Sequence, residues 1–186
     1  MPLKTYIQDL AKNMTYRIRS ACSTDLSNIL TLIHRKAVFD GCPNSVTATP
    51  EKLEKTLFCS QPLAHILLAE TKDSSDPPVG FASYHFTYST FLAQPCLWLD
   101  DIFVESDRRN QGMGARLVHR LCQIAQQHDC GRIDWTVNIN NDAGIRFYQR
   151  MGAKLKTEVY LCRLDPKAVN QQSHSILSKT TFAQTS

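Results

Sequence analysis

The segment that most constrains the fold is PCLWLDDIFVESDRRNQGMGAR, residues 95–116. Aromatic and β-branched residues on both sides of Asp100 and Asp101 predict a buried strand over about 96–105. Two glycines follow, and an amphipathic pattern then predicts a helix from Gly112 to about His128. A strand, a glycine-containing turn and a helix therefore have to fit together in direct succession.

Asp100 and Asp101 are unusual in such a strand, because Asp is depleted in strands and an ionised carboxylate is expensive to bury without a partner. Successive side chains of a regular strand point to opposite faces of the sheet. The two carboxylates are therefore expected to differ in role, unless a β-bulge re-aims one of them.

The remaining pattern predicts an α/β layered domain. Helices are expected over about 24–39, from Thr49 as N-cap with Pro50 in the first turn, and over 141–152. Further strands are expected from Tyr16 and over 65–70, 79–88, 131–139 and 158–164. The domain is expected to span 14–165, after a flexible leader over 1–13 and before a polar, mobile tail over 166–186.

Composition excludes several classes of protein. The net charge of +4 is mild and the basic residues are scattered, which argues against a nucleic-acid partner. No apolar run approaches the roughly 18 residues that span a bilayer, and the N-terminus has no signal-peptide core, so we expect a cytoplasmic protein that does not bind membranes. The seven cysteines include no CxxC pair, and no spaced set of Cys and His ligands predicts a metal site.

The loop RRNQGMGAR is suited to phosphate oxygens, because successive backbone N–H groups continue into a helix N-terminus. Gly112 and Gly114 allow close approach of a ligand, and Arg109 adds a positive charge. The alternative is a glycine-containing turn that only begins a helix. The dinucleotide motif GxGxxG fails, since its third glycine would fall at Leu117, and no Lys-Ser/Thr pair follows as in a P-loop.

Two fragments resemble motifs of the GNAT N-acetyltransferase superfamily. RNQGMG, residues 109–114, is similar to the acetyl-CoA motif R/Q-x-x-G-x-G/A, and NDAGIRFYQRMGA, residues 141–153, is similar to a second family segment in the expected order. The stretches IRSACSTDLSNILTLI, VGFASYHFTYSTF and LWLDDIFV look like those of the spermidine/spermine (diamine) acetyltransferases. The resemblance covers roughly 16–165.

The resemblance implies a mixed, mostly antiparallel central sheet flanked by helices, with a coenzyme-binding strand–loop–helix. It also implies a homodimer that transfers acetyl from acetyl-CoA to a primary amine of a diamine, a polyamine or an amino acid with a distal amine. Coenzyme contacts would come from Phe103, Val104, Arg109, Asn110, Gln111, Gly112, Met113, Gly114, Ala115 and Asn141.

Catalytic roles follow by the same resemblance. An alkyl ammonium has a pKa of about 10.4 and must lose a proton before it attacks. Asp100 stands at the family's substrate carboxylate, as ligand of the amine and possible base. Tyr148 stands at the family's tyrosine near the leaving sulfur, although a Tyr beside a Phe can also simply pack in a core.

Substrate contacts are expected from Asp40, Asp100 and Asp101. Asp40 lies in a turn-like FDGCPN segment, so a turn role is the alternative for it, and Asp101 can either assist Asp100 or stabilise the fold. Ser89 stands where the spermidine/spermine enzymes carry an acid, and Asp100 is shorter than the Glu that is common there. Fewer and shorter acids leave a short diamine, ornithine or thialysine, or an aromatic amine as candidate acceptors.

Two other functions remain open at this stage. The same fold can acetylate a protein N-terminus or a lysine, and a peptide-sized open groove would favour that function. A non-catalytic acyl-CoA-binding module could use the same loop, although the acids and Tyr148 argue for an enzyme.

Overall fold

The computed structural model describes residues 16–71 and 76–175, so the expected leader over 1–13 lies outside the described residues. The chain divides into two compact units, Met1–Phe147 and Tyr148–Ser186, and the boundary falls inside helix α5. The elements in chain order are β1 (Tyr16–Ser20), η1 (Ser23–Asp25), α2 (Leu26–Phe39), η2 (Pro43–Ser45), α3 (Pro50–Leu57), β2 (His65–Thr71), β3 (Gly80–Ser89), β4 (Gln94–Val104), η3 (Ser106–Arg108), α4 (Met113–Gln127), β5 (Ile133–Asp134), α5 (Asp142–Arg150) and α6 (Pro166–Ser175).

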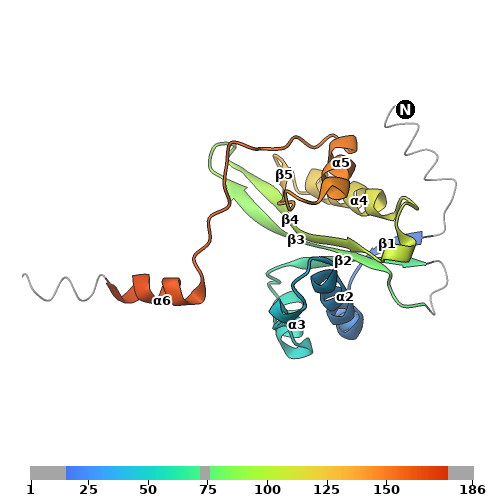
Figure 1. Cartoon of the computed structure of the whole chain (residues 1–186), viewed down its shortest axis with the longest axis horizontal. Helices are drawn as coiled ribbons and strands as arrows, with labels where there is room; N and C mark the ends of the chain where they lie inside the picture. The colour runs from blue at the N-terminus through green and yellow to red at the C-terminus, as the bar shows by residue number, and fades with distance from the viewer. Residues whose placement is uncertain (1–15, 72–75, 176–186) are drawn as a thin grey trace, which may run out of the picture. The chain divides into compact units, whose positions relative to one another are not determined.

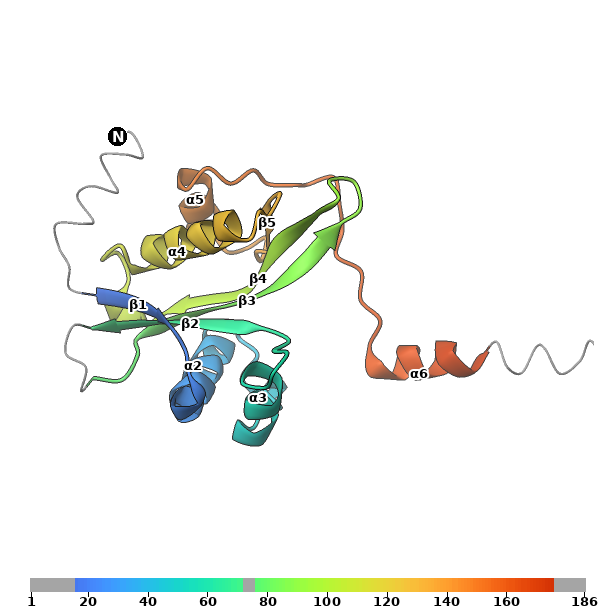
Figure 2. The same cartoon turned by 180° about the vertical axis from the view of Figure 1, so that it is seen from behind.

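The first unit is built on a five-stranded sheet in the order β1-β2-β3-β4-β5. Neighbouring strands are antiparallel from β1 to β4, and β5 pairs parallel to β4. Helices α2 and α3 cover one face of this sheet, and α4 covers the other (Figures 1 and 2). The predicted mixed, mostly antiparallel sheet flanked by helices is confirmed.

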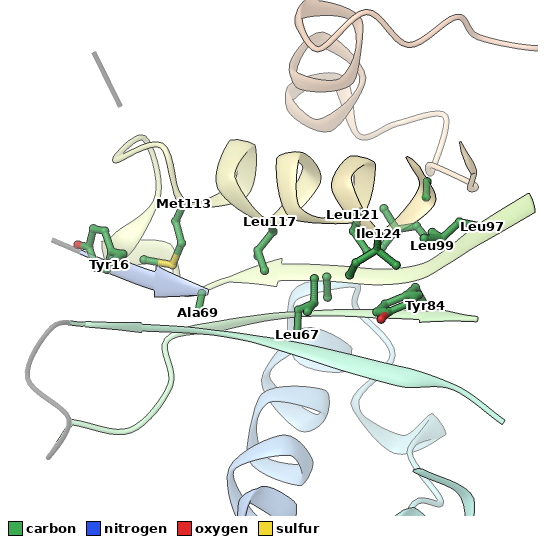
Figure 3. Close-up of a cluster of buried hydrophobic side chains, with 12 residues drawn as sticks. Tyr16, Leu67, Ala69, Tyr84, Leu97, Leu99, Met113, Leu117, Leu121 and Ile124 are labelled. Atoms are coloured by element: carbon green, nitrogen blue, oxygen red, sulfur yellow. The ribbon is translucent and has the colours of Figure 1, made fainter. Parts of the chain in front are cut away.

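Each face of the sheet carries its own apolar cluster. Under α4, side chains from the helix such as Leu117 and Leu121 meet strand residues such as Leu97 and Leu99 (Figure 3). On the opposite face, α2 packs against the sheet through a second cluster that includes Phe103 of β4. Because both faces are packed, each residue of β4 is assigned to the α4 face or to the α2 face.

A β-bulge interrupts this alternation at the two aspartates. Ser83 of β3 pairs with Asp101 and Tyr84 pairs with Leu99, so Asp100 is the extra residue without a partner in β3. Leu99 lies on the α4 face before the bulge, and Ile102 packs against the same cluster after it. Asp100 and Asp101, between them, therefore both face α2, whereas a regular strand would have separated them.

The C-terminal part of the sequence differs from its expected secondary structure. The strand expected over 131–139 is reduced to Ile133–Asp134, and 158–164 forms no strand. Val159 and Tyr160 are exposed, so the β-branched and aromatic residues of that segment are not buried as they would be in a core strand. The tail begins with a helix, Pro166–Ser175.

Gly80 lets β3 approach β4 closely, and replacing it with Ala is expected to destabilise the fold. An added Cβ would lie 2.7 Å from the backbone oxygen of Phe103 and 3.2 Å from Val104 Cγ2. Backbone cannot swing aside as a side chain can, so we expect urea denaturation to show a loss of about 1–3 kcal/mol of unfolding free energy.

Gly114→Ala is the matched control for that stability measurement. Its added Cβ would make only an ordinary contact, 3.5 Å from Phe147, and Ala favours a helix over Gly. An unchanged midpoint for Gly80→Ala would contradict the steric argument.

Candidate functional site

The loop between β4 and α4 has the backbone geometry of an anion-binding turn. Asn110 has φ 61° and Gly112 has φ 81°, and Gly112 is the N-cap of α4. The first hydrogen bond into the helix runs from Arg116 N–H to Gly112 O at 3.1 Å. The N–H groups of Met113, Gly114 and Ala115 therefore have no helical acceptor and can serve phosphate oxygens.

Packing within the protein does not require a glycine at position 114. A Cβ there would meet only the Phe147 ring, at an ordinary 3.5 Å. Close approach of a ligand to the backbone gives a reason for the missing side chain.

Side chains hold this loop in place. The Tyr16 hydroxyl of β1 donates to Gln111 Oε1, and Gln111 Nε2 donates to Asp107 O at 3.3 Å. Arg109 Nε donates to Val104 O at 2.9 Å, and its guanidinium lies 4.2 Å from the centre of the Phe39 ring. Arg109 is thus anchored, with its positive charge beside the loop.

The edge of β4 that faces away from β3 carries open backbone groups. In the described chain, β5 pairs with β4 only at Leu97 and Trp98. Glu105 N–H donates to Val79 O, and bonding alternates along an antiparallel pair, so the polar backbone groups of Val104 face the other edge, where Val104 O accepts from Arg109 and Val104 N–H points outward. Those of Phe103 face β3. An extended ligand can bind to such an edge as an added strand does.

A pocket of about 420 Å³ lies between the C-terminal half of α2 and the end of β4. Its lining combines basic and apolar side chains with one acid: His34, Arg35, Val38, Phe103, Glu105, Ser106 and Arg109. Two predicted coenzyme residues, Phe103 and Arg109, belong to this lining, whereas the three predicted substrate acids do not. The pocket's charge suits an anionic ligand.

The three predicted substrate acids gather on the α2 face around a residue that the sequence did not single out. Lys36, in the last turn of α2, places its Nζ 2.7 Å from Asp101 Oδ1 and also donates to Asp40 Oδ2. Burial acts to lower the pKa of Lys36, but the hydrogen bonds to Asp101 and Asp40 outweigh it, so this pKa is raised and the ammonium stays charged.

Asp100 differs from its neighbour because it forms no ion pair among the described residues. Partial burial raises the pKa of its carboxyl, and the negative charge of Asp101 raises it further. Electrostatic interactions with His85 and Lys36 and a hydrogen bond from the Trp98 side chain act in the opposite direction. A carboxylate with a raised pKa and no cation of its own is a good proton acceptor.

Residues near α5 complete the predicted set. Asn141 Oδ1 accepts from Gly144 N–H at 2.9 Å, so Asn141 caps α5 as well as standing at a predicted coenzyme position. Tyr148 is buried and is the first residue of the second unit.

Sequence reasoning missed Lys36, His85 and Trp98 as neighbours of the acids. His85 pairs with Trp98 across β3 and β4, and alternation puts both on the face of Asp100. The alternation expected along the strand VGFASYHFTY could have shown on which face of the sheet His85 lies. Ser89 is buried, where its Oγ accepts from Arg132 at 3.2 Å and from Leu92 N–H at 3.4 Å, so it stabilises the β3–β4 hairpin.

The described part of the chain has neither a cluster of metal ligands nor a membrane-spanning helix. No group of three or more His, Cys, Asp and Glu side chains there could hold a metal ion. No helix in that part of the chain combines the length and apolar character needed to cross a membrane.

Comparison with known proteins gives one family match. The model of the acetyltransferase (GNAT) family matches residues 31–153. Human spermidine/spermine N(1)-acetyltransferase-like protein 1 is 34% identical over 142 residues, which cover 74% of this chain but 20% of that protein.

Two further relatives align over most of their own length. Thialysine N-epsilon-acetyltransferase of Bos taurus is 30% identical, covering 76% of this chain and 85% of its own. L-ornithine N5-acetyltransferase NATA1 of Arabidopsis thaliana is 30% identical, over 84% of this chain and 87% of that protein.

Solved structures share the fold at lower identity. An integron cassette protein of V. cholerae superposes with a TM-score of 0.69 at 24% identity, over 87% of this chain and 99% of that one. An aminoglycoside acetyltransferase from an uncultured soil metagenomic sample also gives 0.69, at 17% identity, over 82% and 99%.

Proposed function

The chain belongs to the acetyltransferase (GNAT) family, and from this premise we propose that it transfers the acetyl group of acetyl-CoA to a primary amine of a small molecule. The observation that carries this proposal is the β-bulge that turns Asp100 and Asp101 to one face. Two carboxylates on one surface, one with a raised pKa, suit an ammonium acceptor that has to be deprotonated. The relatives named for acting on thialysine and ornithine support a small acceptor.

The coenzyme would be held by the loop and by the edge of β4. The N–H groups from Asn110 to Ala115 would bind the pyrophosphate, with Arg109 adding positive charge. Val104, and Phe103 next to it, would position the pantetheine arm, and Asn141 would contact the coenzyme further along. The open edge of β4 supports this arrangement, because β5 does not extend to Val104 among the described residues and the Val104 N–H can serve a polar ligand atom.

In the reaction, Asp100 would accept a proton from the acceptor ammonium, directly or through water. The free amine then forms the new N–C bond to the acetyl carbon, and backbone N–H groups of the site stabilise the oxyanion. The nitrogen of the tetrahedral adduct then loses its second proton to solvent, and as the C–S bond breaks, Tyr148 would supply a proton to the leaving thiolate and recover one from solvent. Holding the amine and the thioester in line would lower the activation free energy by several kcal/mol, about 7 or more in favourable cases.

We further propose that the enzyme is a cytoplasmic homodimer whose catalytic domain spans 14–165. Its free cysteines, five of them exposed, suit a reducing compartment. The homodimer and the domain limits follow from the resemblance to the diamine acetyltransferases.

The proposal predicts turnover of acetyl-CoA with a small amine. We expect mass spectrometry to detect an N-acetylated product, and one equivalent of released thiol, when the full chain is incubated with acetyl-CoA and a panel of diamines, polyamines, amino acids and peptides. Acetylation of peptides alone would make the protein a peptide or protein acetyltransferase. Coenzyme binding without acetylation of any amine would reduce it to a binding module.

A further inference from the structure

Lys36 brings a positive charge of the protein itself into the cluster of substrate acids. Its ammonium lies 2.7 Å from Asp101 Oδ1 and donates to Asp40. The side chain of Lys36 is 20% exposed, while those of Asp40 and Asp101 are 39% and 33% exposed. The cluster is thus reachable from solvent, and its cation is the most enclosed member.

The ion pairs change what the cluster can bind. Lys36 forms ion pairs with two of the three carboxylates and offsets one of their two negative charges, whereas Asp100 forms no ion pair among the described residues. A second ammonium on an acceptor would have to compete with Lys36 for Asp40 or Asp101, and would approach a like charge. A carboxylate on the acceptor would be attracted to Lys36, since an ammonium has three N–H donors and two are directed to the acids.

We propose that Lys36 determines acceptor specificity, selecting amino acids with a distal amine over diamines and polyamines. The reacting ammonium binds at Asp100, and Lys36 occupies the place that the second ammonium of a polycation would need. Repulsion between like charges in the complex with the disfavoured substrate is a common way for a protein to discriminate between substrates. This inference rests on the proposed function and narrows its substrate class.

Ornithine and putrescine provide a matched test, because putrescine is ornithine without its α-carboxylate. The far end of ornithine is a zwitterion, whereas that of putrescine is a cation. We expect the wild-type chain to have a higher kcat/KM for ornithine than for putrescine. In Lys36→Met the ratio of the two kcat/KM values should move toward putrescine by about tenfold or more, as removal of a near like charge requires.

A ratio is insensitive to the folded fraction of a variant, so partial unfolding of Lys36→Met does not obscure the result. Lys36→Arg keeps the charge and should retain the ornithine preference. Lys55→Met removes an exposed charge of α3 and should leave the ratio unchanged.

Two results would overturn the inference while amine acetylation stands: a wild-type preference for putrescine, or a ratio that Lys36→Met leaves within twofold. If no amine is acetylated, the proposed function itself fails.

Discussion

We expect the replacement of Asp100 with Asn to lower kcat for amine acetylation by about 100-fold or more, because the proposed general base would be lost. Asn keeps the size of the side chain and its place in the bulge but cannot take a proton. Steady-state kinetics with the best amine of the panel, together with the Kd of acetyl-CoA, checks this result. The coenzyme Kd should change little, since Asp100 lies outside the loop.

The pH dependence gives this prediction a sign. A base acts only when deprotonated, so we expect kcat to fall as the pH drops through the pKa of Asp100. Burial and the charge of Asp101 raise that pKa. The acid limb should therefore lie above the ordinary Asp value of about 3.9. Asp101→Asn removes a negative charge that raises the pKa of Asp100, and it leaves Lys36 paired with Asp40 alone. This variant should therefore move the acid limb of the kcat profile to lower pH.

Asp129→Asn is the control for Asp100→Asn. Asp129 is exposed just after α4, with φ 50°, a conformation that Asn tolerates well. It should keep wild-type turnover. Undiminished turnover in Asp100→Asn would remove Asp100 from the mechanism.

We expect Tyr148→Phe to lower kcat by about 10–100-fold, within the lower range of acid catalysis, and to leave the Kd of acetyl-CoA nearly constant. The ring of Tyr148 is buried, and Phe retains its packing while removing the hydroxyl that would protonate the thiolate. Turnover and equilibrium binding of the coenzyme, measured on one preparation, separate the two effects.

Tyr160→Phe provides the matched control, because Tyr160 belongs to the same unit and is 93% exposed. It should behave as wild type in both measurements. A Tyr148→Phe enzyme with normal kcat would assign Tyr148 to the core alone.

Much of the fold could be predicted because local signals agree with burial. Thr49 caps α3 as expected, accepting from Lys52 N–H at 3.3 Å, with Pro50 in the first turn. The strand expected over 79–88 differs from β3 by one residue at each end. In contrast, segment 158–164 has the composition of a strand but forms none. A strand needs a neighbouring strand to pair with, and composition does not show whether one is available.

The candidate site was predictable in its residues but not in its arrangement. The acetyl-CoA motif indicated Gly112, and the resemblance of LWLDDIFV to the family strand indicated Asp100; in the structure Gly112 has a left-handed backbone, which favours glycine. Lys36 escaped notice because a lysine at the end of a helix usually stays in solvent. Only the fold brings it to Asp101, 65 positions later in the sequence, across the α2 face.

The bulge in β4 also suggests how a second acid can be added to a finished sheet. If either Asp100 or Asp101 is left out of the count, Leu97 to Val104 alternates regularly between the two packed faces. The extra aspartate therefore behaves as an insertion, and the residues before and after it still alternate correctly between the two apolar clusters. Two positions on one face of a regular strand are about 6–7 Å apart, so only such an insertion sets two neighbouring carboxylates side by side. The bulge thus brings two carboxylates to one face while the residues on either side of it keep their places in the two cores.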